Sequence, residues 1–531
     1  VQAPIVLRLN QKADLRIRLE VASVSETVTV NADAAMVNTT NSEISTSFES
    51  KRVSELPLAA DRNILNLALQ VPGVSQLSSG QTSFASGGVN FASNGMRVRS
   101  NNFMIDGQDS NDPSVTGNQQ TINNPDIVAE VRIITNQFLP EYGRAAGSVV
   151  SIVTKAGTND LHGSGFWFYN GNALNSLSNQ EVSAGRTKVP FLSEHQWGWT
   201  LGGPAILPKV YNGKNKTFFF TSLQRWTIRQ LGAGQTLNGA PTEEGRRLLQ
   251  PLAAGRPQIQ AILDFIPAGT PDGRSDTINT GTQILTIPFG NLTGFSSIGQ
   301  TNWQGSARFD HRFNDRHLLT GRYMVNDNMS SGTGQVTPPG FTTISPSRAQ
   351  SSTLSWNWTP KSNLYNEFRA SYQRLNTLTN AVNPASERIP SLEVASMGLV
   401  GINAAASRTA IGLAVNLPQF RRNNTYQIQN TTGWILGSHS MKFGIDFRRV
   451  DIISFFGPTA RGLVGYDNMQ RLYDDIATTA SINATLPGGD VIWPFKQYDY
   501  YAFWQDEWRI TRNFTLTYGL RYETPGPTLN S

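Results

Sequence analysis

The chain has 531 residues, too many for one ordinary domain, so two or more structural units are expected. Charged residues make up 15% of the chain, and the formal net charge of +6 is spread along the sequence without a basic cluster, which argues against nucleic-acid binding. Cysteine is absent, which excludes disulfide frameworks, cysteine-ligated zinc sites and cysteine nucleophiles.

Residues 1–25 contain a short strand pattern in which Leu15, Ile17 and Leu19 alternate with charged residues. Too few residues precede this pattern to form a core, so we expect the last strands of a β-sandwich that begins before the chain. The chain starts at Val1 without a signal-peptide pattern, and we therefore expect that further residues precede it in the gene.

Residues 33–160 are expected to form a compact α+β domain. Asp61 is a suitable N-cap for a helix that follows an apolar run to Val71 and ends at Pro72-Gly73. Three strands should follow, and Asp106-Gly107 is a turn signal directly after the first of them. The expected strands are Met96–Ile105, Ile127–Thr135 and Val149–Thr154.

After residue 160 the pattern changes to long segments of alternating polarity. In the segment Asn302–Phe313, for example, Trp303 and Phe309 lie on one face while Arg308 and Asp310 lie on the other. Segments of about ten residues with this alternation are typical of transmembrane barrel strands, although soluble sandwiches contain them too. Eleven such segments lie near residues 163–171, 195–204, 216–229, 300–313, 317–327, 349–359, 363–375, 424–434, 440–452, 497–510 and 514–523.

The connections between these segments favour the barrel. Tight turns are expected at Asn314–Arg316, Pro360–Ser362, Leu436–His439 and Thr511–Asn513. They alternate with loops of tens of residues, such as 230–299 and 376–423, as in outer-membrane barrels. The sequence contains no run of about 20 apolar residues, so no transmembrane helix is predicted. We therefore predict a mainly β chain, with a partial transmembrane antiparallel β-barrel behind an N-terminal α+β domain. The partial barrel has about 11 strands.

Several short motifs occur in a characteristic order. In the first half they are Asn101–Gly107, Phe138–Gly147, Val153–Asn159 and His162–Ser164. In the second half they are Leu201–Pro204, Lys216–Phe220, Lys442–Arg448 and Tyr518–Tyr522. Together these motifs resemble TonB-dependent outer-membrane receptors of the Oar-like type, in which a carboxypeptidase-regulatory-like domain precedes a plug domain and a barrel.

The resemblance implies a domain order and a location. Residues 1–25 would end the carboxypeptidase-regulatory-like sandwich, and 33–160 would be the plug. Residues 161–531 would be the N-terminal half of the barrel, about 11 of an expected 22 strands, with long extracellular loops. The expected location is the bacterial outer membrane, in contact with its lipid. The expected function is active import of a large or scarce extracellular ligand, a peptide, glycan or metal chelate, through the gated barrel. A surface adhesion or assembly protein that uses the same barrel is the alternative, and a soluble secreted β-sandwich binder is a third hypothesis.

A candidate partner-binding segment lies between the first two of these domains. It consists of Glu26, Thr27, Val28, Thr29, Val30, Asn31 and Ala32. The segment resembles the TonB box, which pairs with the periplasmic energy-coupling protein by adding a strand to it. Threonine and valine suit an added strand, but an ordinary strand or linker has the same composition.

Two loops and one apolar stripe remain open to interpretation. The loops Ser78–Gly88 and Gln108–Asn123 either face the ligand or serve as connectors. The stripe within Thr242–Ile266 predicts a short helix that packs on its own extracellular loop.

No enzyme site or cofactor site is predicted. The five histidines, His162, His195, His311, His317 and His439, lack metal-ligand spacing. Asp506 and Glu507 would point to opposite faces of one strand, which is unsuitable for paired acid–base chemistry. We predict no catalytic residues, no metal site and no cofactor, and the ligand-contacting residues are unknown.

Overall fold

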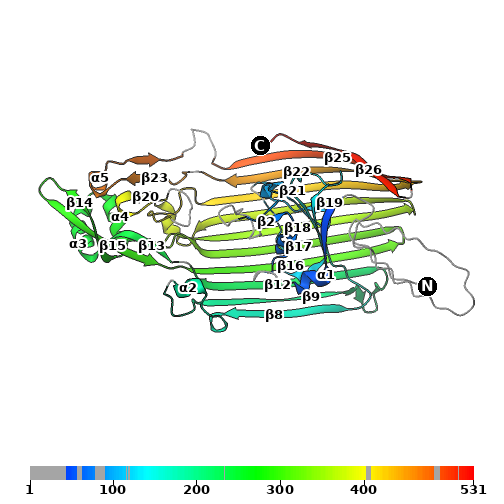
Figure 1. The fold of residues 1–531 in the computed structure, drawn as a ribbon, viewed down its shortest axis with the longest axis horizontal. Coiled ribbons are helices and arrows are strands. Elements are labelled where there is room, and N and C mark those ends of the chain that lie inside the picture. The colour runs from blue at the N-terminus through cyan, green and yellow to red at the C-terminus, as the bar shows by residue number, and fades with distance from the viewer. Residues whose placement is uncertain are drawn as a thin grey trace, which may run out of the picture.

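The computed structural model describes residues 43–56, 62–77, 90–114, 117, 120–183, 185–232, 234–401, 408–457, 459–483, 491–511 and 513–530. Its main feature is a twelve-stranded sheet, here called the wall, whose long strands run side by side along the molecule (Figure 1). Eleven wall strands follow one another in chain order, each antiparallel to the next. They are β8 (His162–Gly171), β9 (Leu192–Pro204), β12 (Thr217–Leu231), β16 (Ser297–Asn314), β17 (His317–Gly334), β18 (Thr342–Lys361), β19 (Leu364–Ala381), β21 (Gln419–Leu436), β22 (His439–Phe455), β25 (Trp493–Thr511) and β26 (Phe514–Pro525), and β27 (Leu529–Asn530) pairs with β25.

The two faces of the wall differ in polarity because successive side chains of a strand point to opposite sides. On β16, Trp303 and Phe309 are exposed on the outer face, whereas Gln304 and Asp310 are buried on the inner face. On β22, Ile445 is exposed and Arg448 is buried. An apolar outer face and a polar inner face are the arrangement of a membrane barrel.

All eleven predicted strand segments are confirmed. Most are longer than expected at the end away from the tight turns. For example, β17 continues to Gly334 and β18 starts at Thr342, because backbone pairing persists where side-chain alternation fades. In the described part of the chain, β8 and β26 lie at the two edges of the wall and do not pair with each other, so this sheet is an open, partial barrel. None of the described helices is long and apolar enough to cross a membrane.

A smaller body, here called the inner unit, precedes the wall and lies against its polar face (Figure 1). Its five-stranded sheet has the order β1-β6-β7-β4-β5, with β4 parallel to β7 and the other pairs antiparallel. A cluster of buried apolar residues, including Phe48, Leu67, Phe103, Ile133 and Ile152, fills its core. Its elements are β1 (Ile44–Glu49), α1 (Ser50–Glu55), η1 (Ile64–Gln70), β2 (Val74–Gln76), β3 (Phe91–Ser93), η3 (Val98–Ser100), β4 (Asn102–Ile105), β5 (Gln108–Asp109), η4 (Pro125–Ile127), β6 (Val128–Asn136) and β7 (Val149–Thr154).

Two element predictions for this unit need correction. The predicted helix is the 3-10 helix η1, and its N-cap is Asn63, whose side chain accepts a hydrogen bond from the Leu65 amide at 3.0 Å. The expected cap Asp61 lies outside the described residues. The predicted strand Met96–Ile105 begins only at Asn102, because the 3-10 turn η3 precedes it. The strands expected near Ile127–Thr135 and at Val149–Thr154 are confirmed as β6 and β7.

At the end of the wall opposite the tight turns, the long loops fold together into a third body, here called the cap (Figure 1). One loop contributes a three-stranded sheet and two α-helices, and two later loops contribute a second three-stranded sheet and one more α-helix. The first group is β13 (Gln235–Pro241), α3 (Glu243–Leu249), η6 (Gln250–Ala253), α4 (Pro257–Phe265), β14 (Thr270–Asn279) and β15 (Ile284–Gly294). The second is η7 (Pro384–Arg388), β20 (Ser391–Val394), η8 (Ala395–Met397), β23 (Leu463–Tyr466), α5 (Met469–Asp474) and β24 (Thr479–Ser481).

The cap has one hydrophobic core that several loops share. Ile262 of α4, Leu413 and Met469 of α5 belong to the same buried cluster although they come from three different loops. The predicted helix within Thr242–Ile266 exists as two helices, but its apolar stripe packs across loops and not only on its own loop. Short elements outside these bodies are η5 (Asn172–Leu174), α2 (Asn179–Ser183), β10 (Ile206–Leu207) and β11 (Tyr211–Asn212).

Candidate functional site

The candidate site is the contact between the inner unit and the wall, and it centres on the hairpin of β4 and β5. Asp106 and Gly107 form the two-residue turn of this hairpin, with φ values of 48° and 75°. Positive φ at both positions is typical of tight hairpin turns. A Cβ atom on Gly107 would clash with the guanidinium of Arg369 in the wall, so glycine permits this close approach. Arg369 donates a hydrogen bond from Nη1 to the Gly107 carbonyl at 3.0 Å.

Three aspartates spaced three residues apart in this segment each form an ion pair with an arginine of the wall. Asp106 lies 3.3 Å from Nη1 of Arg322, and Asp112 lies 3.7 Å from Nη1 of Arg421. Asp109 forms an ion pair with Arg448. The hairpin and the residues that follow it are therefore held to several wall strands by opposite charges.

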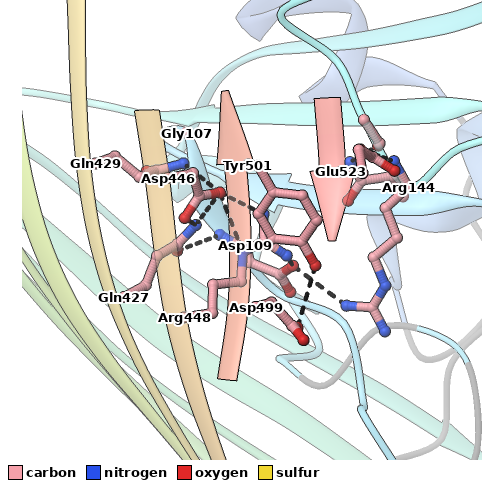
Figure 2. A network of polar contacts seen from close by, with 12 residues as sticks. Gly107, Asp109, Arg144, Gln427, Gln429, Asp446, Arg448, Asp499, Tyr501 and Glu523 are labelled. Atoms are coloured by element: carbon pink, nitrogen blue, oxygen red, sulfur yellow. Dashed lines mark hydrogen bonds and ion pairs between the residues drawn. The ribbon is translucent and has the colours of Figure 1, made fainter. Parts of the chain in front are cut away.

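Asp109 is buried between the inner unit and the wall, where several polar side chains surround it (Figure 2). Burial alone would raise the pKa of the Asp109 carboxyl, but Arg448, Arg144 and hydrogen bonds from Asn111 lower it overall. The guanidinium of Arg448 is also bound by Asp446, at 2.7 Å from Nη2. Asp446 in turn accepts hydrogen bonds from Gln427, at 3.1 and 3.0 Å. Asp109 is thus ionised and part of a continuous polar network.

A second contact is made by the loop after β6. Glu141 forms an ion pair with Lys442 of β22, and its amide donates to Oε1 of Gln505 at 3.0 Å. The Arg144 amide donates to Oε1 of Glu523 at 3.1 Å, with Arg144 in the left-handed conformation at φ 59°. A Cβ atom on Gly143 would clash with the same Glu523 oxygen. The Glu523 side chain of β26 therefore contacts this loop directly.

A cavity of about 190 Å³ lies beside the two contacts. It is bounded by the inner unit on one side and by β21, β22, β25 and β26 on the other. Its charged side chains are Asp109, Arg144, Arg448, Asp499 and Glu523, and Tyr501 lies beside them (Figure 2).

The rest of the interface is mainly polar and uncharged. Gln304 of β16 accepts from the Asn123 amide at 3.0 Å, and Gln108 donates to the Tyr372 carbonyl at 3.2 Å. Within the apolar cluster of the inner unit, the wall supplies Phe220 and Met324. Because the contact relies on hydrogen bonds and ion pairs, its two sides can separate without exposing a large apolar surface.

The predicted site residues have different outcomes. The segment Glu26–Ala32 lies outside the described residues. The loop Gln108–Asn123 is not a free connector, because Gln108, Asp109 and Asp112 are buried against the wall. The loop Ser78–Gly88 also lies outside the described residues.

The interface residues themselves were not predicted as a site, although the sequence contained a signal. Four of the motifs that carry the family resemblance meet here. Asp106 belongs to the first, Glu141 and Arg144 to the second, Lys442 and Arg448 to a third, and Arg521 to the fourth. Their convergence depends on wall register, which the motifs alone do not specify.

The histidines do not form a metal site in the described part of the chain. No group of three or more His, Asp or Glu side chains there is placed to hold a metal ion. Several histidines pack against aromatic rings of the wall, such as His317 on Trp356 with ring centroids 5.7 Å apart. This packing places them in aromatic clusters of the outer face.

Comparison with known proteins gives three findings. Residues 153–531 match a family described as "Outer membrane beta barrel domain". The chain is 24% identical over 222 residues to the TonB-dependent transporter Oar of Myxococcus xanthus, an alignment that covers 40% of this chain and 20% of Oar.

The fold is similar to solved outer-membrane proteins. The outer membrane transporter YddB of Escherichia coli matches with a TM-score of 0.55 at 12% identity, over 91% of this chain and 57% of that one. A variant of the ferric enterobactin receptor PfeA of Pseudomonas aeruginosa matches with 0.53 at 11% identity, over 91% and 57%. The siderophore receptor PirA of Acinetobacter baumannii matches with 0.52 at 14% identity, over 90% and 56%. The chain therefore spans little more than half the length of these structures, and a fifth of Oar.

Proposed function

The chain belongs to the outer membrane β-barrel domain family, and from this premise we propose that it acts as a TonB-dependent, plug-gated importer. The wall lies in the bacterial outer membrane, with its apolar face toward lipid. The inner unit is the plug, and the cap faces the outside of the cell. Residues 33–160 and 161–531 are the proposed plug and the proposed N-terminal half of the barrel, after a sandwich that ends at residue 25.

The observation that carries this proposal is the polar contact between the inner unit and the wall. A gate has to stay closed at rest and yet move when a partner pulls on it. Ion pairs such as Asp109–Arg448 and Glu141–Lys442 fix the closed position. Since the apolar core of the plug lies almost wholly within the plug itself, moving the plug would cost mainly these polar contacts. Binding of a partner can then shift the equilibrium between closed and open forms.

The proposed partner is a TonB-type periplasmic energy-coupling protein, and the proposed contact is the segment Glu26–Ala32. An extended Thr/Val segment adds a strand to a partner sheet through its backbone hydrogen bonds. The cargo is a large or scarce peptide, glycan or metal chelate. The relatives named above are transporters and receptors, and we propose no catalytic activity and no bound cofactor.

The test is energy-dependent uptake by cells that express the protein with residues 26–32 deleted. Three labelled probes cover the cargo classes: a peptide digest, a polysaccharide digest and a ferric catecholate. We expect at least one probe to accumulate in a manner that depends on the proton gradient and on residues 26–32. Val28→Pro should also abolish uptake, because proline lacks the amide needed for strand addition, whereas Val28→Thr should retain it. Unchanged uptake with equal surface expression of the deletion protein would contradict the proposal.

A surface adhesion or assembly protein is the second candidate, and the cap is the observation that favours it. The loops form one folded body with its own core, which suits a rigid binding face as well as a receptor. Removal of the energy-coupling protein distinguishes the two. An importer should lose uptake, whereas an adhesin should keep its attachment to surfaces or cells.

A further inference from the structure

Two charged side chains beside Asp109, Arg144 and Glu523, have hydrogen-bonding atoms left over from the contact between plug and wall. Arg144 donates through Nη1 to Asp109 at 3.3 Å, and its side chain is 40% exposed. Its guanidinium carries further N–H groups, and none of the described residues accepts a hydrogen bond from them. Glu523 uses Oε1 to accept from the Arg144 amide and from Arg521, and its side chain is 34% exposed. Within the described part of the chain, its second oxygen, Oε2, accepts no hydrogen bond.

Polar contacts orient both groups, since Arg144 donates to Asp109, and Glu523 accepts from the Arg144 amide and from Arg521. Arg144 has a left-handed backbone conformation, which residues other than glycine adopt only at a cost in free energy. Glu523 holds this conformation through the Arg144 amide (Figure 2). Backbone strain of this kind tends to be found at ligand-binding and switch sites. The guanidinium and the carboxylate are therefore held in place on the cavity wall before any ligand arrives.

The charges of the lining indicate which ligand chemistry fits. Three carboxylates and two guanidinium groups line the cavity, so its formal net charge is −1. An anionic metal chelate would meet repulsion from Asp499 and Glu523. A neutral glycan would leave the available groups of Arg144 and Glu523 without a charged counterpart. A ligand with both an ammonium and a carboxylate group can pair with the Glu523 carboxylate and the Arg144 guanidinium at the same time.

The volume of the cavity and its apolar lining residues suit a small ligand group. Drug-sized ligands occupy pockets of roughly 300–1,000 Å³, whereas this cavity measures about 190 Å³. Val450, Ile452 and Pro113 line it as well, and they provide an apolar surface for a short aliphatic side chain.

We propose that this cavity binds the zwitterionic part of the cargo, an ammonium and a carboxylate carried by an amino-acid- or dipeptide-sized group. The ligand carboxylate pairs with Arg144, and the ligand ammonium pairs with Glu523 and Asp499. This inference deepens the proposed import function, since it selects peptide-like cargo from the three classes. Binding can nevertheless be measured without transport.

The experiment is titration calorimetry of the full-length protein in detergent with dialanine as the probe. Dialanine should bind, and N-acetyl-dialanine amide, which lacks both charges, should bind about 10- to 100-fold more weakly because charge-assisted contacts are lost. Arg144→Gln and Glu523→Gln should weaken dialanine binding to a similar degree. Arg144→Lys should retain most of the affinity.

Arg274→Gln is the matched control, because Arg274 is an exposed arginine of the cap that pairs with Asp272. It should leave dialanine binding unchanged. No heat with dialanine up to the millimolar range, or equal affinity for the blocked peptide, would overturn the proposal. So would equal dialanine affinity of the wild-type protein and Arg144→Gln. If dialanine binds as described but residues 26–32 prove dispensable for uptake, the cavity assignment stands and the import mechanism fails.

Discussion

Asp109 lies between a guanidinium of the inner unit, Arg144, and one of the wall, Arg448. The Asp109→Asn substitution would leave Arg448 buried with Asp446 as its remaining carboxylate partner. Breaking a buried pair costs about 3–5 kcal/mol, and we expect the low end, about 3 kcal/mol, because Asp446 stays. Hydrogen exchange at the amides of β4 and β5 should accelerate accordingly. Asp327→Asn, which removes an exposed pair with Arg348, should have almost no effect. Equal protection in Asp109→Asn and the wild-type protein would contradict the importance of the ion pair.

The lowered pKa of Asp109 predicts how pH affects this contact. An aspartate whose pKa is lower in the folded protein stabilises it fully above the unfolded pKa of about 3.9. The stabilisation is lost as the pH falls through that value toward the folded pKa. Protection of β4 and β5, corrected for intrinsic exchange, should therefore be constant from about pH 7 to 5 and should decrease below about pH 4. In Asp109→Asn the loss of protection at acid pH should be smaller. A pH profile identical to that of the wild-type protein would refute the assignment of this loss to Asp109.

Gly107 offers a test of the close approach between the hairpin and the wall. Gly107→Ala would have to adopt a positive φ, which costs about 1–2 kcal/mol, and would displace the guanidinium of Arg369. Gly95→Ala is the matched control, because Gly95 has φ 74° but open space around its Cβ position. We expect the urea midpoint of the inner unit to fall further in Gly107→Ala than in Gly95→Ala. Equal shifts would mean that the contact with Arg369 is easily rearranged.

Among the elements, the cap helices illustrate contact between loops that are distant in sequence. The side chain of Gln258 in α4 donates to the Leu472 carbonyl of α5 at 3.0 Å, and Arg256 lies over the Tyr473 ring at 4.0 Å. Met469 of α5 is fully buried in the shared core.

Met469→Ala should cost about 2–5 kcal/mol, because it leaves a cavity in this core. The loss should appear as faster hydrogen exchange in α4, which belongs to a different loop. Ile284→Ala is the control, since Ile284 is 71% exposed and its truncation should leave α4 protected. Faster exchange confined to α5 would show that the loops fold independently.

The wall strands could be predicted because their signal is local. Alternation of apolar and polar residues, with tight turns such as Asn314–Arg316, defines each hairpin from its own sequence. The 3-10 turn before Asn102 was missed because the run from Met96 has a strand-like composition, and the turn is fixed by tertiary contacts such as Asn101 Nδ2 to the Phe91 carbonyl at 2.9 Å. The ion pairs of Asp109 with Arg448 and of Glu141 with Lys442 join residues more than 300 positions apart. Such pairs depend on the register of the wall strands and on the way the inner unit docks against the wall. The alternation of apolar and polar residues determines neither.

At the scale of the whole molecule, the three bodies are held by different forces. The wall relies on continuous backbone pairing, which lipid strengthens because unpaired groups are costly there. The cap and the inner unit each have an apolar core. The inner unit contacts the wall mainly through polar groups.

This difference predicts two unfolding steps in urea for the protein in detergent. The inner unit should unfold first, while the wall keeps its β-structure. Proteolysis at Arg132, which is buried in the folded inner unit, should report the first step, and far-ultraviolet circular dichroism should report the second. Coincident transitions would indicate that the inner unit and the wall depend on each other for folding.

The shared core of the cap also limits how its loops can diverge between related proteins. Ile262, Leu413 and Met469 contact one common interior, so a change of side-chain volume in one loop needs compensation in another. A chimera that receives a single loop from a relative would inherit a mismatched interior. A chimera that receives the whole set would inherit an intact surface, so new binding preferences should be transferable as a block and not loop by loop.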